Sequence, residues 1–143
     1  RITDIQCALG RSQLLRLDQF VEKRRRIAAK YDDFFESNEV ANPPLAAKDV
    51  THSYHLYPLQ INFETTELSK LELFKVMRNE GIGLQVHYIP IHWQSYYQRH
   101  YHFDRHQFPN AVQFYNREVS LPIYPDLKES EQNKVIQALV KHL

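Results

Sequence analysis

The sequence predicts a mixed α/β protein in which a long connecting helix precedes a small sheet packed with helices. The 143 residues include 43% hydrophobic residues, which is the size and composition of one ordinary domain with its own core. Helical and strand periodicities alternate along the chain. The formal net charge is only +1, and no apolar run approaches the roughly 18 residues that a membrane helix needs. These observations argue against a membrane protein and against a nucleic-acid-binding protein.

A long helix is expected to begin at Thr3. Thr3 and Gln6 have the spacing of a capping box, in which each side chain bonds to the backbone N–H of the other residue. Two helical apolar stripes follow, and they are out of phase across Gly10, so a bend is expected there. We assign residues 1–40 to this connecting arm, outside the compact core, and residues 41–143 to the following domain.

The first strand is expected at residues 57–63, where apolar and polar residues alternate. Pro58 has no N–H to donate, which favours an edge strand or an irregular start. A helix then follows, capped by Thr65 or Thr66, and it ends at Gly81, which readily adopts the left-handed conformation of a helix stop. Its inward-facing residues are expected to be Leu68, Leu71, Phe74, Val76 and Met77.

A second strand is expected directly afterwards, at residues 82–88, and Pro90 closes it. His87 lies on the strand face opposite the core, beside Gly83 and Gln85, where there is room for a ligand. The core face is expected to hold Ile82, Leu84, Val86 and Tyr88.

The last third of the chain begins with an aromatic and histidine-rich stretch, in which one short helix is expected near residues 94–99. Pro109 favours the start of a helix that continues to about Val119. Residues 121–125 contain two prolines and are expected to be extended. Ser130 is expected to cap a final helix whose apolar face holds Val135, Ile136, Leu139, Val140 and Leu143.

Several kinds of chemistry find little support. Three glycines are too few and too scattered for the phosphate-binding loops of dinucleotide-binding or P-loop proteins. No serine or cysteine lies in a nucleophile motif, which argues against a hydrolase. Cys7 is the single cysteine, so an internal disulfide cannot form, and no signal segment opens the chain. A cytoplasmic location is therefore expected.

The histidines leave two alternatives open. His87 is a candidate for a ligand-facing group, since imidazole can donate or accept hydrogen bonds near neutral pH. His100, His102 and His106 favour instead a metal-binding or interaction module that is not an enzyme, although they lack the cysteine or carboxylate of a typical zinc site. Nucleic-acid binding through the basic run at residues 22–26 is a further alternative, against which the small net charge argues.

Four segments of the chain have the residue order of a known family. The segments are R-I-T-D-I-Q-C-A-L-G from Arg1 with Q-L and L-D beyond it, H-S-Y-H-L-Y-P at 52–58, G-I-G-L-Q-V-H-Y-I-P-I-H at 81–92, and S-L-P-I-Y-P at 120–125. In their order and spacing, and over nearly the whole chain, they resemble the DegT/DnrJ/EryC1/StrS family of pyridoxal-phosphate-dependent nucleotide-sugar aminotransferases. Within the family, they look most like the subgroup that aminates a 4-keto UDP-N-acetylhexosamine on the way to pseudaminic acid.

The resemblance implies that the chain is the C-terminal small domain of a fold-type I transferase, with its connecting helix. In the family, the Schiff-base lysine and the cofactor contacts lie upstream of the segment that begins at Arg1, and none of the eight lysines here matches that motif. The chain alone is therefore expected to hold no catalytic or cofactor-binding residue and to be inactive. Its parent is expected to be a homodimer that uses pyridoxal 5'-phosphate and glutamate to aminate a 4-keto nucleotide sugar.

The resemblance also implies which residues lie on the substrate side of the site. Arg1 matches a family arginine near the dimer interface, where a guanidinium suits the diphosphate of the substrate. His87 matches a family histidine that faces the active site. Tyr88, its neighbour on the opposite strand face, ranks below it, and His92 is placed at the mouth of the same site.

Overall fold

The structure is a computed structural model that describes residues 1–47 and 49–143, and it confirms the mixed α/β character. Lys48, one of the eight lysines, lies outside the described residues. The elements are α1 (Asp4–Leu14), α2 (Leu17–Phe35), β1 (Ala41–Asn42), β2 (Tyr57–Ile61), α3 (Lys70–Asn79), the 3-10 helix η1 (Ile91–Trp93), α4 (Ser95–Tyr101), α5 (Pro109–Arg117), β3 (Glu118–Leu121) and α6 (Glu129–His142).

The three strands form one antiparallel sheet in the order β1, β2, β3. The strand predicted at residues 57–63 is thus confirmed as β2, but it is the middle strand and not an edge strand. Pro58 is tolerated there because β1 pairs only with Gln60 and Ile61, so that Pro58 has a strand partner on one side alone, Ser120 of β3.

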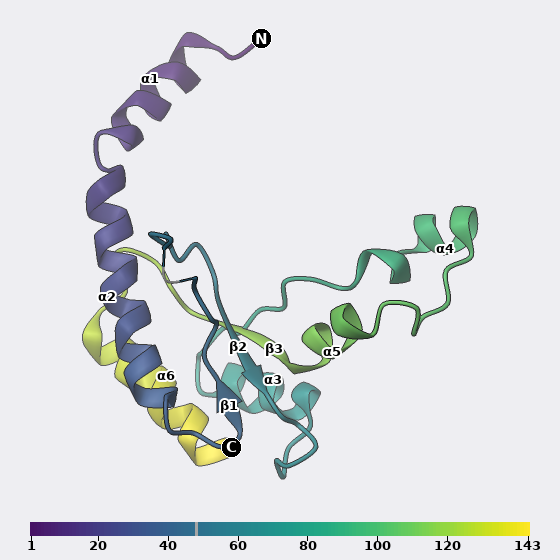
Figure 1. Cartoon of the computed structure of the whole chain (residues 1–143). Helices are drawn as coiled ribbons and strands as arrows, with labels where there is room; N and C mark the ends of the chain where they lie inside the picture. The colour runs from purple at the N-terminus through teal and green to yellow at the C-terminus, as the bar shows by residue number, and fades with distance from the viewer. Residues whose placement is uncertain (48) are drawn as a thin grey trace.

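The core lies on one face of this sheet. Residues of a strand alternate between faces, and the buried apolar side chains of β2 and β3 share the face that α2 and α6 cover. Figure 1 shows α2 and α6 side by side along this face. The core residues of these four elements are Tyr57, Leu59, Ile61, Val119, Leu121, Ile27, Ala28, Tyr31, Phe35, Val135, Ile136, Ala138 and Leu139.

The connecting arm therefore differs in part from the expectation. The second half of α2 belongs to the core, since four of its residues are buried there. By contrast, α1 has no buried residue and extends away from the sheet (Figure 1). The capping box between Thr3 and Gln6 is confirmed. The break between the two helices lies at Leu15 and Arg16, not at Gly10, which sits within α1. The division of the chain at residue 40 stays a prediction.

The expected start of α3 is wrong. Ser69, not Thr65 or Thr66, caps this helix, through a capping box with Glu72. The inward face shifts accordingly, so that Leu73 and Met77 are buried, whereas Leu71 is 66% exposed. The expected helix stop at Gly81 is confirmed by a positive φ of 78°.

The expected strand at residues 82–88 forms only a single antiparallel bridge, between Gln85 and Ser120. Fewer residues of this segment are buried in the core than expected. Ile82 is buried and Leu84 and Val86 are half-buried, but Tyr88 is 73% exposed.

The ends of the last helices also differ from expectation. The short helix near residues 94–99 is confirmed as α4. The helix that begins at Pro109 ends at Arg117, because residues 118–121 form β3 instead of its last turn. The final helix, α6, begins at Glu129, and Lys128 takes the capping position predicted for Ser130. On its predicted apolar face, Val140 is 56% exposed.

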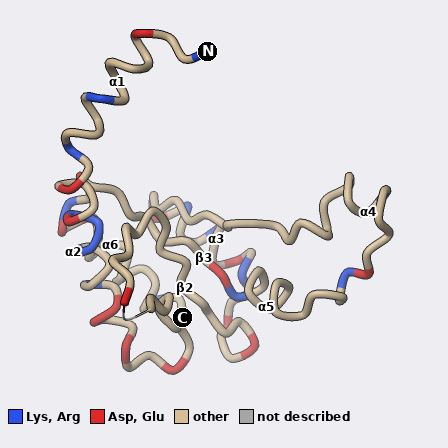
Figure 2. The backbone as a smooth tube through the Cα atoms, turned by 45° about the horizontal axis from the view of Figure 1, so that its top comes forward, with Lys and Arg blue, Asp and Glu red and all other residues tan. Residues whose placement is uncertain are grey.

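Several charged residues of α2 form ion pairs at the surface. Figure 2 shows basic and acidic residues interspersed along α2. Arg26 lies 3.0 Å from Glu22, and Lys23 lies 3.1 Å from Asp126 near the start of α6. This pairing gives no continuous basic surface for nucleic acid. None of the helices among the described residues has the length and apolar character to cross a membrane.

We expect Gly81→Ala to lower the free energy of unfolding by about 1–2 kcal/mol, since a side chain disfavours the left-handed conformation. The N–H of Gly81 bonds to the carbonyl of Arg78 and that of Ile82 to Met77, so the turn cannot relax without breaking these bonds. Urea unfolding measures the change. Gly83→Ala is the matched control, because its new Cβ would meet no atom within 4 Å. Equal losses in both variants would contradict the prediction.

A second prediction concerns Asp32, whose Oδ1 accepts a 2.7 Å hydrogen bond from the Tyr57 hydroxyl. Burial raises the pKa of Asp32, and the bond from Tyr57 offsets this only in part. The folded state therefore disfavours the charged carboxylate. The free energy of unfolding falls as the pH rises through the folded pKa of Asp32, because the carboxyl loses its proton there. Asp32→Asn keeps an acceptor for Tyr57 and removes the charge.

We therefore expect Asp32→Asn to be more stable than the wild type near pH 7. The gain should shrink on acidification towards about pH 4, where the carboxyl becomes neutral. Urea unfolding at both pH values checks this, with Glu39→Gln as the control at an exposed position beyond α2. A loss of stability in Asp32→Asn at neutral pH would refute the assignment.

Candidate functional site

Three segments that lie far apart in the sequence meet around one cavity of about 280 Å³. They belong to three of the four segments singled out in the sequence. We call this the His87 cavity. It is lined by His55 and Leu56, by Gly83, Gln85 and His87, and by Ser120 through Tyr124.

Hydrogen bonds to β3 fix His87 at this cavity. The backbone N–H of His87 donates to Oε2 of Glu118 at 3.0 Å, and its Nδ1 lies 2.8 Å from Oγ of Ser120. The Ser120 hydroxyl donates to Oε1 of the same carboxylate at 2.5 Å. Glu118 and Ser120 are 1% and 4% exposed, so water competes little for these bonds. The imidazole is thereby held in one orientation.

Backbone and side-chain bonds also hold the cavity walls. Gln85 and Ser120 exchange both backbone hydrogen bonds, at 2.8 and 3.2 Å, which fixes the His87 segment against β3. On the other side, the hydroxyl of the buried Tyr31 donates to the carbonyl of Pro122 at 3.1 Å. The cavity is therefore built on the sheet and on α2, with little freedom to collapse.

Of the other predicted site residues, none lines this cavity. Arg1 is exposed at the free end of α1, away from the sheet (Figure 1). The exposed ring of Tyr88 lies edge-on to the ring of His87, with the two ring centres 4.7 Å apart. His92 is only 5% exposed, and its Nε2 lies 3.0 Å from the carbonyl oxygen of Arg105. The substrate-side roles of Arg1, Tyr88 and His92 stay predictions.

Sequence reasoning missed the two residues that hold His87. The sequence indicates Ser120 only as part of the segment at residues 120–125, and it predicts Glu118 at the end of a helix. The alternation of Glu118 and Ser120 with Val119 and Leu121 was the available signal, because it has the period of a strand with one polar face. His55, which lies in the segment at residues 52–58, also lines the cavity.

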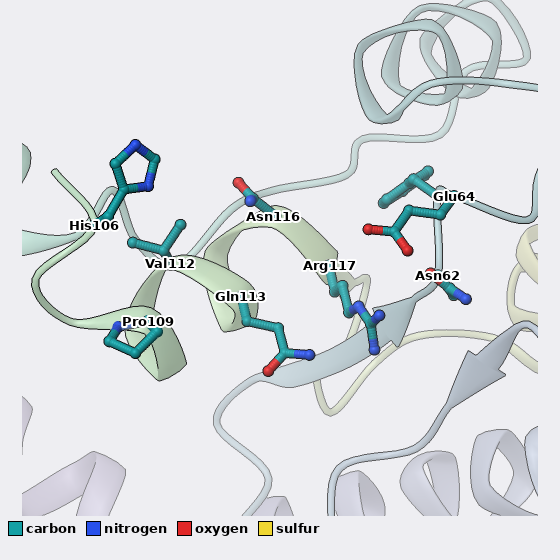
Figure 3. A pocket seen from close by; sticks show the side chains of 9 residues that line it. Asn62, Glu64, His106, Pro109, Val112, Gln113, Asn116 and Arg117 are labelled. Carbon is teal, nitrogen blue, oxygen red and sulfur yellow. The ribbon is translucent and has the colours of Figure 1, made fainter.

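Two other cavities contain none of Arg1, His87, Tyr88 and His92. Figure 3 shows one of about 310 Å³, in which Asn62 and Glu64, just beyond β2, lie opposite Gln113 and Arg117 of α5. The second, of about 550 Å³, borders α3 and includes the half-buried Lys70. Burial lowers the pKa of Lys70, and its Nζ donates to the carbonyl of Tyr115 at 2.5 Å.

The histidines proposed as metal ligands do not come together. Among the residues that the structure describes, no three His, Cys, Asp or Glu side chains lie close enough to hold a metal ion. His106 lines the cavity of Figure 3, whereas the His100 ring packs on Tyr96 at 4.4 Å, and His102 ends α4. The metal-binding alternative is therefore not favoured.

The His87 cavity does not fit pyridoxal phosphate as a covalently held cofactor. Among residues 1–47 and 49–143, no lysine lines it to form a Schiff base, and no arginine lines it to pair with a phosphate. The lining instead consists of apolar, aromatic, imidazole, amide and hydroxyl groups. Such a lining suits an uncharged polar group with a nonpolar face, such as a sugar ring.

Comparison with known proteins gives a consistent result. A sequence profile described as the DegT/DnrJ/EryC1/StrS aminotransferase family matches residues 1–140. The UDP-4-amino-4,6-dideoxy-N-acetyl-beta-L-altrosamine transaminase of Campylobacter jejuni is 37% identical over 127 residues, which are 89% of this chain and 33% of that protein. The chain spans about a third of the length of the curated relatives it matches.

Solved structures are also similar. Helicobacter pylori PseC, an aminotransferase involved in the biosynthesis of pseudoaminic acid, matches with a TM-score of 0.88 and 31% identity, over 99% of this chain and 37% of that one. The PLP-form of Spr1654, a putative sugar aminotransferase from Streptococcus pneumoniae, matches with a TM-score of 0.84 and 28% identity, over 96% of this chain and 34% of that one.

Proposed function

Because this chain belongs to the DegT/DnrJ/EryC1/StrS aminotransferase family, we propose that it is the C-terminal small domain of a pyridoxal-phosphate-dependent nucleotide-sugar aminotransferase. The proposed acceptor is a UDP-linked 4-keto-6-deoxy-N-acetylhexosamine, and the proposed amino donor is glutamate. The names of the Campylobacter jejuni and Helicobacter pylori relatives support this sugar class. The enzyme is proposed to act in the cytoplasm.

The observation that carries the proposal is the His87 cavity. Three family-like segments, separated by up to about 60 residues, supply all of its lining residues. Their convergence supports a shared role in binding, and the uncharged lining favours the sugar over the diphosphate.

In this proposal, the chain supplies substrate contacts and the rest of the parent supplies the cofactor site. Pyridoxal phosphate, when bound there, supplies the electron sink that lets an amino group move between donor and acceptor. His87 orients the sugar from the cavity wall, with Tyr88 and His92 towards its mouth, and Arg1 binds the diphosphate. Arg1 lies away from the cavity, which supports a homodimer in which the second subunit completes the site.

We expect the longer protein that carries this chain to convert glutamate and a 4-keto nucleotide sugar into 2-oxoglutarate and an amino sugar, detected by mass spectrometry. His87→Ala should raise KM for the nucleotide sugar roughly tenfold, the effect of losing one hydrogen bond of about 1.4 kcal/mol. The half-reaction with glutamate should not change, because His87 is assigned to the sugar.

His106→Ala is the control for this experiment, since His106 lines the different cavity of Figure 3. Its KM for the nucleotide sugar should equal that of the wild type. The absence of amino-sugar product, or equal KM values for both variants, would count against the proposed function.

The 143-residue chain alone is expected not to bind pyridoxal phosphate in a stoichiometric lysine adduct. Absorbance of lysine-bound cofactor after incubation and gel filtration measures this. Lys70→Arg is the matched control, because burial lowers the pKa of Lys70, which favours the neutral amine that forms a Schiff base. A stoichiometric band in the wild type that Lys70→Arg abolishes would place a cofactor lysine in this chain and refute the proposal.

A further inference from the structure

We propose that Glu118, acting through Ser120, is a positioning residue that keeps the proton of the neutral His87 ring on Nδ1 and leaves Nε2 as a hydrogen-bond acceptor for a sugar hydroxyl. The assignment of the proton follows from the contacts of Glu118 and Ser120. The hydroxyl as ligand rests on the proposed function, which makes the His87 cavity the sugar side of the site.

The first step is the pair of bonds at the buried carboxylate. Oε2 of Glu118 accepts the backbone N–H of His87 at 3.0 Å, a group that can only donate. Oε1 accepts the hydroxyl of Ser120 at 2.5 Å. The Ser120 hydroxyl is the donor in this bond, so it uses its single proton there.

The second step is the bond between Ser120 and the imidazole. Oγ of Ser120 lies 2.8 Å from Nδ1 of His87. Since the hydroxyl proton is already directed at Glu118, Oγ can only accept here, and Nδ1 must carry a proton. In the neutral ring, Nε2 then has a lone pair, and it has no hydrogen-bond partner among the residues that the structure describes.

The third step is the consequence for ligand choice. A lone pair on Nε2 can accept from a hydroxyl or amide N–H, whereas a diphosphate oxygen at neutral pH offers no proton. His87 also belongs to a cavity that is lined by no lysine or arginine of the part of the chain that the structure describes. The two observations agree on an uncharged, proton-donating part of the ligand, which in a nucleotide sugar is a hydroxyl of the sugar.

Nuclear magnetic resonance of the histidine nitrogens in the 143-residue chain tests the assignment, because the two tautomers have distinct ¹⁵N spectra. At a pH where the ring is neutral, His87 should be the Nδ1–H tautomer. His92 is an internal reference for the opposite tautomer, because its Nε2 must carry the proton that it donates to the carbonyl of Arg105. A wild-type His87 with its proton on Nε2 would overturn the inference.

Glu118→Gln gives the sharpest test, because it changes the proton count without changing the shape. The amide oxygen must face the N–H of His87, so the NH₂ group faces Ser120. Ser120 then donates to Nδ1, and His87 should switch to the Nε2–H tautomer. Ser120→Ala, which removes the connecting hydroxyl, should also abolish the preference for Nδ1–H. An unchanged tautomer in both variants would refute a role of Glu118 through Ser120.

Glu129→Gln is the matched control, because Glu129 is an exposed carboxylate that pairs with Lys30 on α2. It should leave the ¹⁵N spectrum of His87 unchanged. A tautomer switch in this variant too would mean that the effect does not depend on the contact between Glu118 and Ser120, and it would overturn the inference.

Kinetics of the longer protein separate this inference from the proposed function. Glu118→Gln should raise KM for the nucleotide sugar roughly tenfold and leave the half-reaction with glutamate unchanged, because Nε2 becomes a donor. If the tautomer switches but KM does not change, the positioning by Glu118 stands, and the assignment of the cavity to the sugar is refuted.

Discussion

The antiparallel pairing of β2 with β3 is the interaction on which the rest of the structure depends. One face of the pair gives Leu59 and Val119 to the core, and the other face gives Glu118 and Ser120 to His87. A shift of β3 by one residue would exchange these faces, so that a carboxylate would enter the apolar core. The free energy of burying the core and the geometry of the site thus depend on the same register.

The sequence predicts elements best where the signal is local. The capping box at Thr3, the helix stop at Gly81 and the alternation in β2 each depend on neighbouring residues, and all three are confirmed. The errors occur where tertiary pairing decides. β3 has only four residues and follows α5 without a break, so it reads as the end of a helix. Residues 82–88 alternate as a strand does, yet they pair only at Gln85.

The sequence predicts the site only in part, because tertiary pairing brings together the residues that hold His87. His87 and Ser120 lie in segments whose residue order matches a family, whereas Glu118 carries no such signal. Its role depends on His87, which is 31 residues away in the sequence and is brought close only by the Gln85 bridge. For His92, a position in a family-like segment does not place the side chain at the cavity. A histidine in a family-like segment is buried against Phe108 and bonds to a backbone carbonyl, a contact that no sequence pattern specifies.

The bond from Tyr31 to Pro122 connects the helix before the sheet with the site. Tyr31 is buried in α2, and its hydroxyl holds a wall of the His87 cavity. The ring of the same residue packs against the buried Tyr57 of β2 in the core. One side chain of α2 therefore contributes both to the apolar core and to the shape of the cavity.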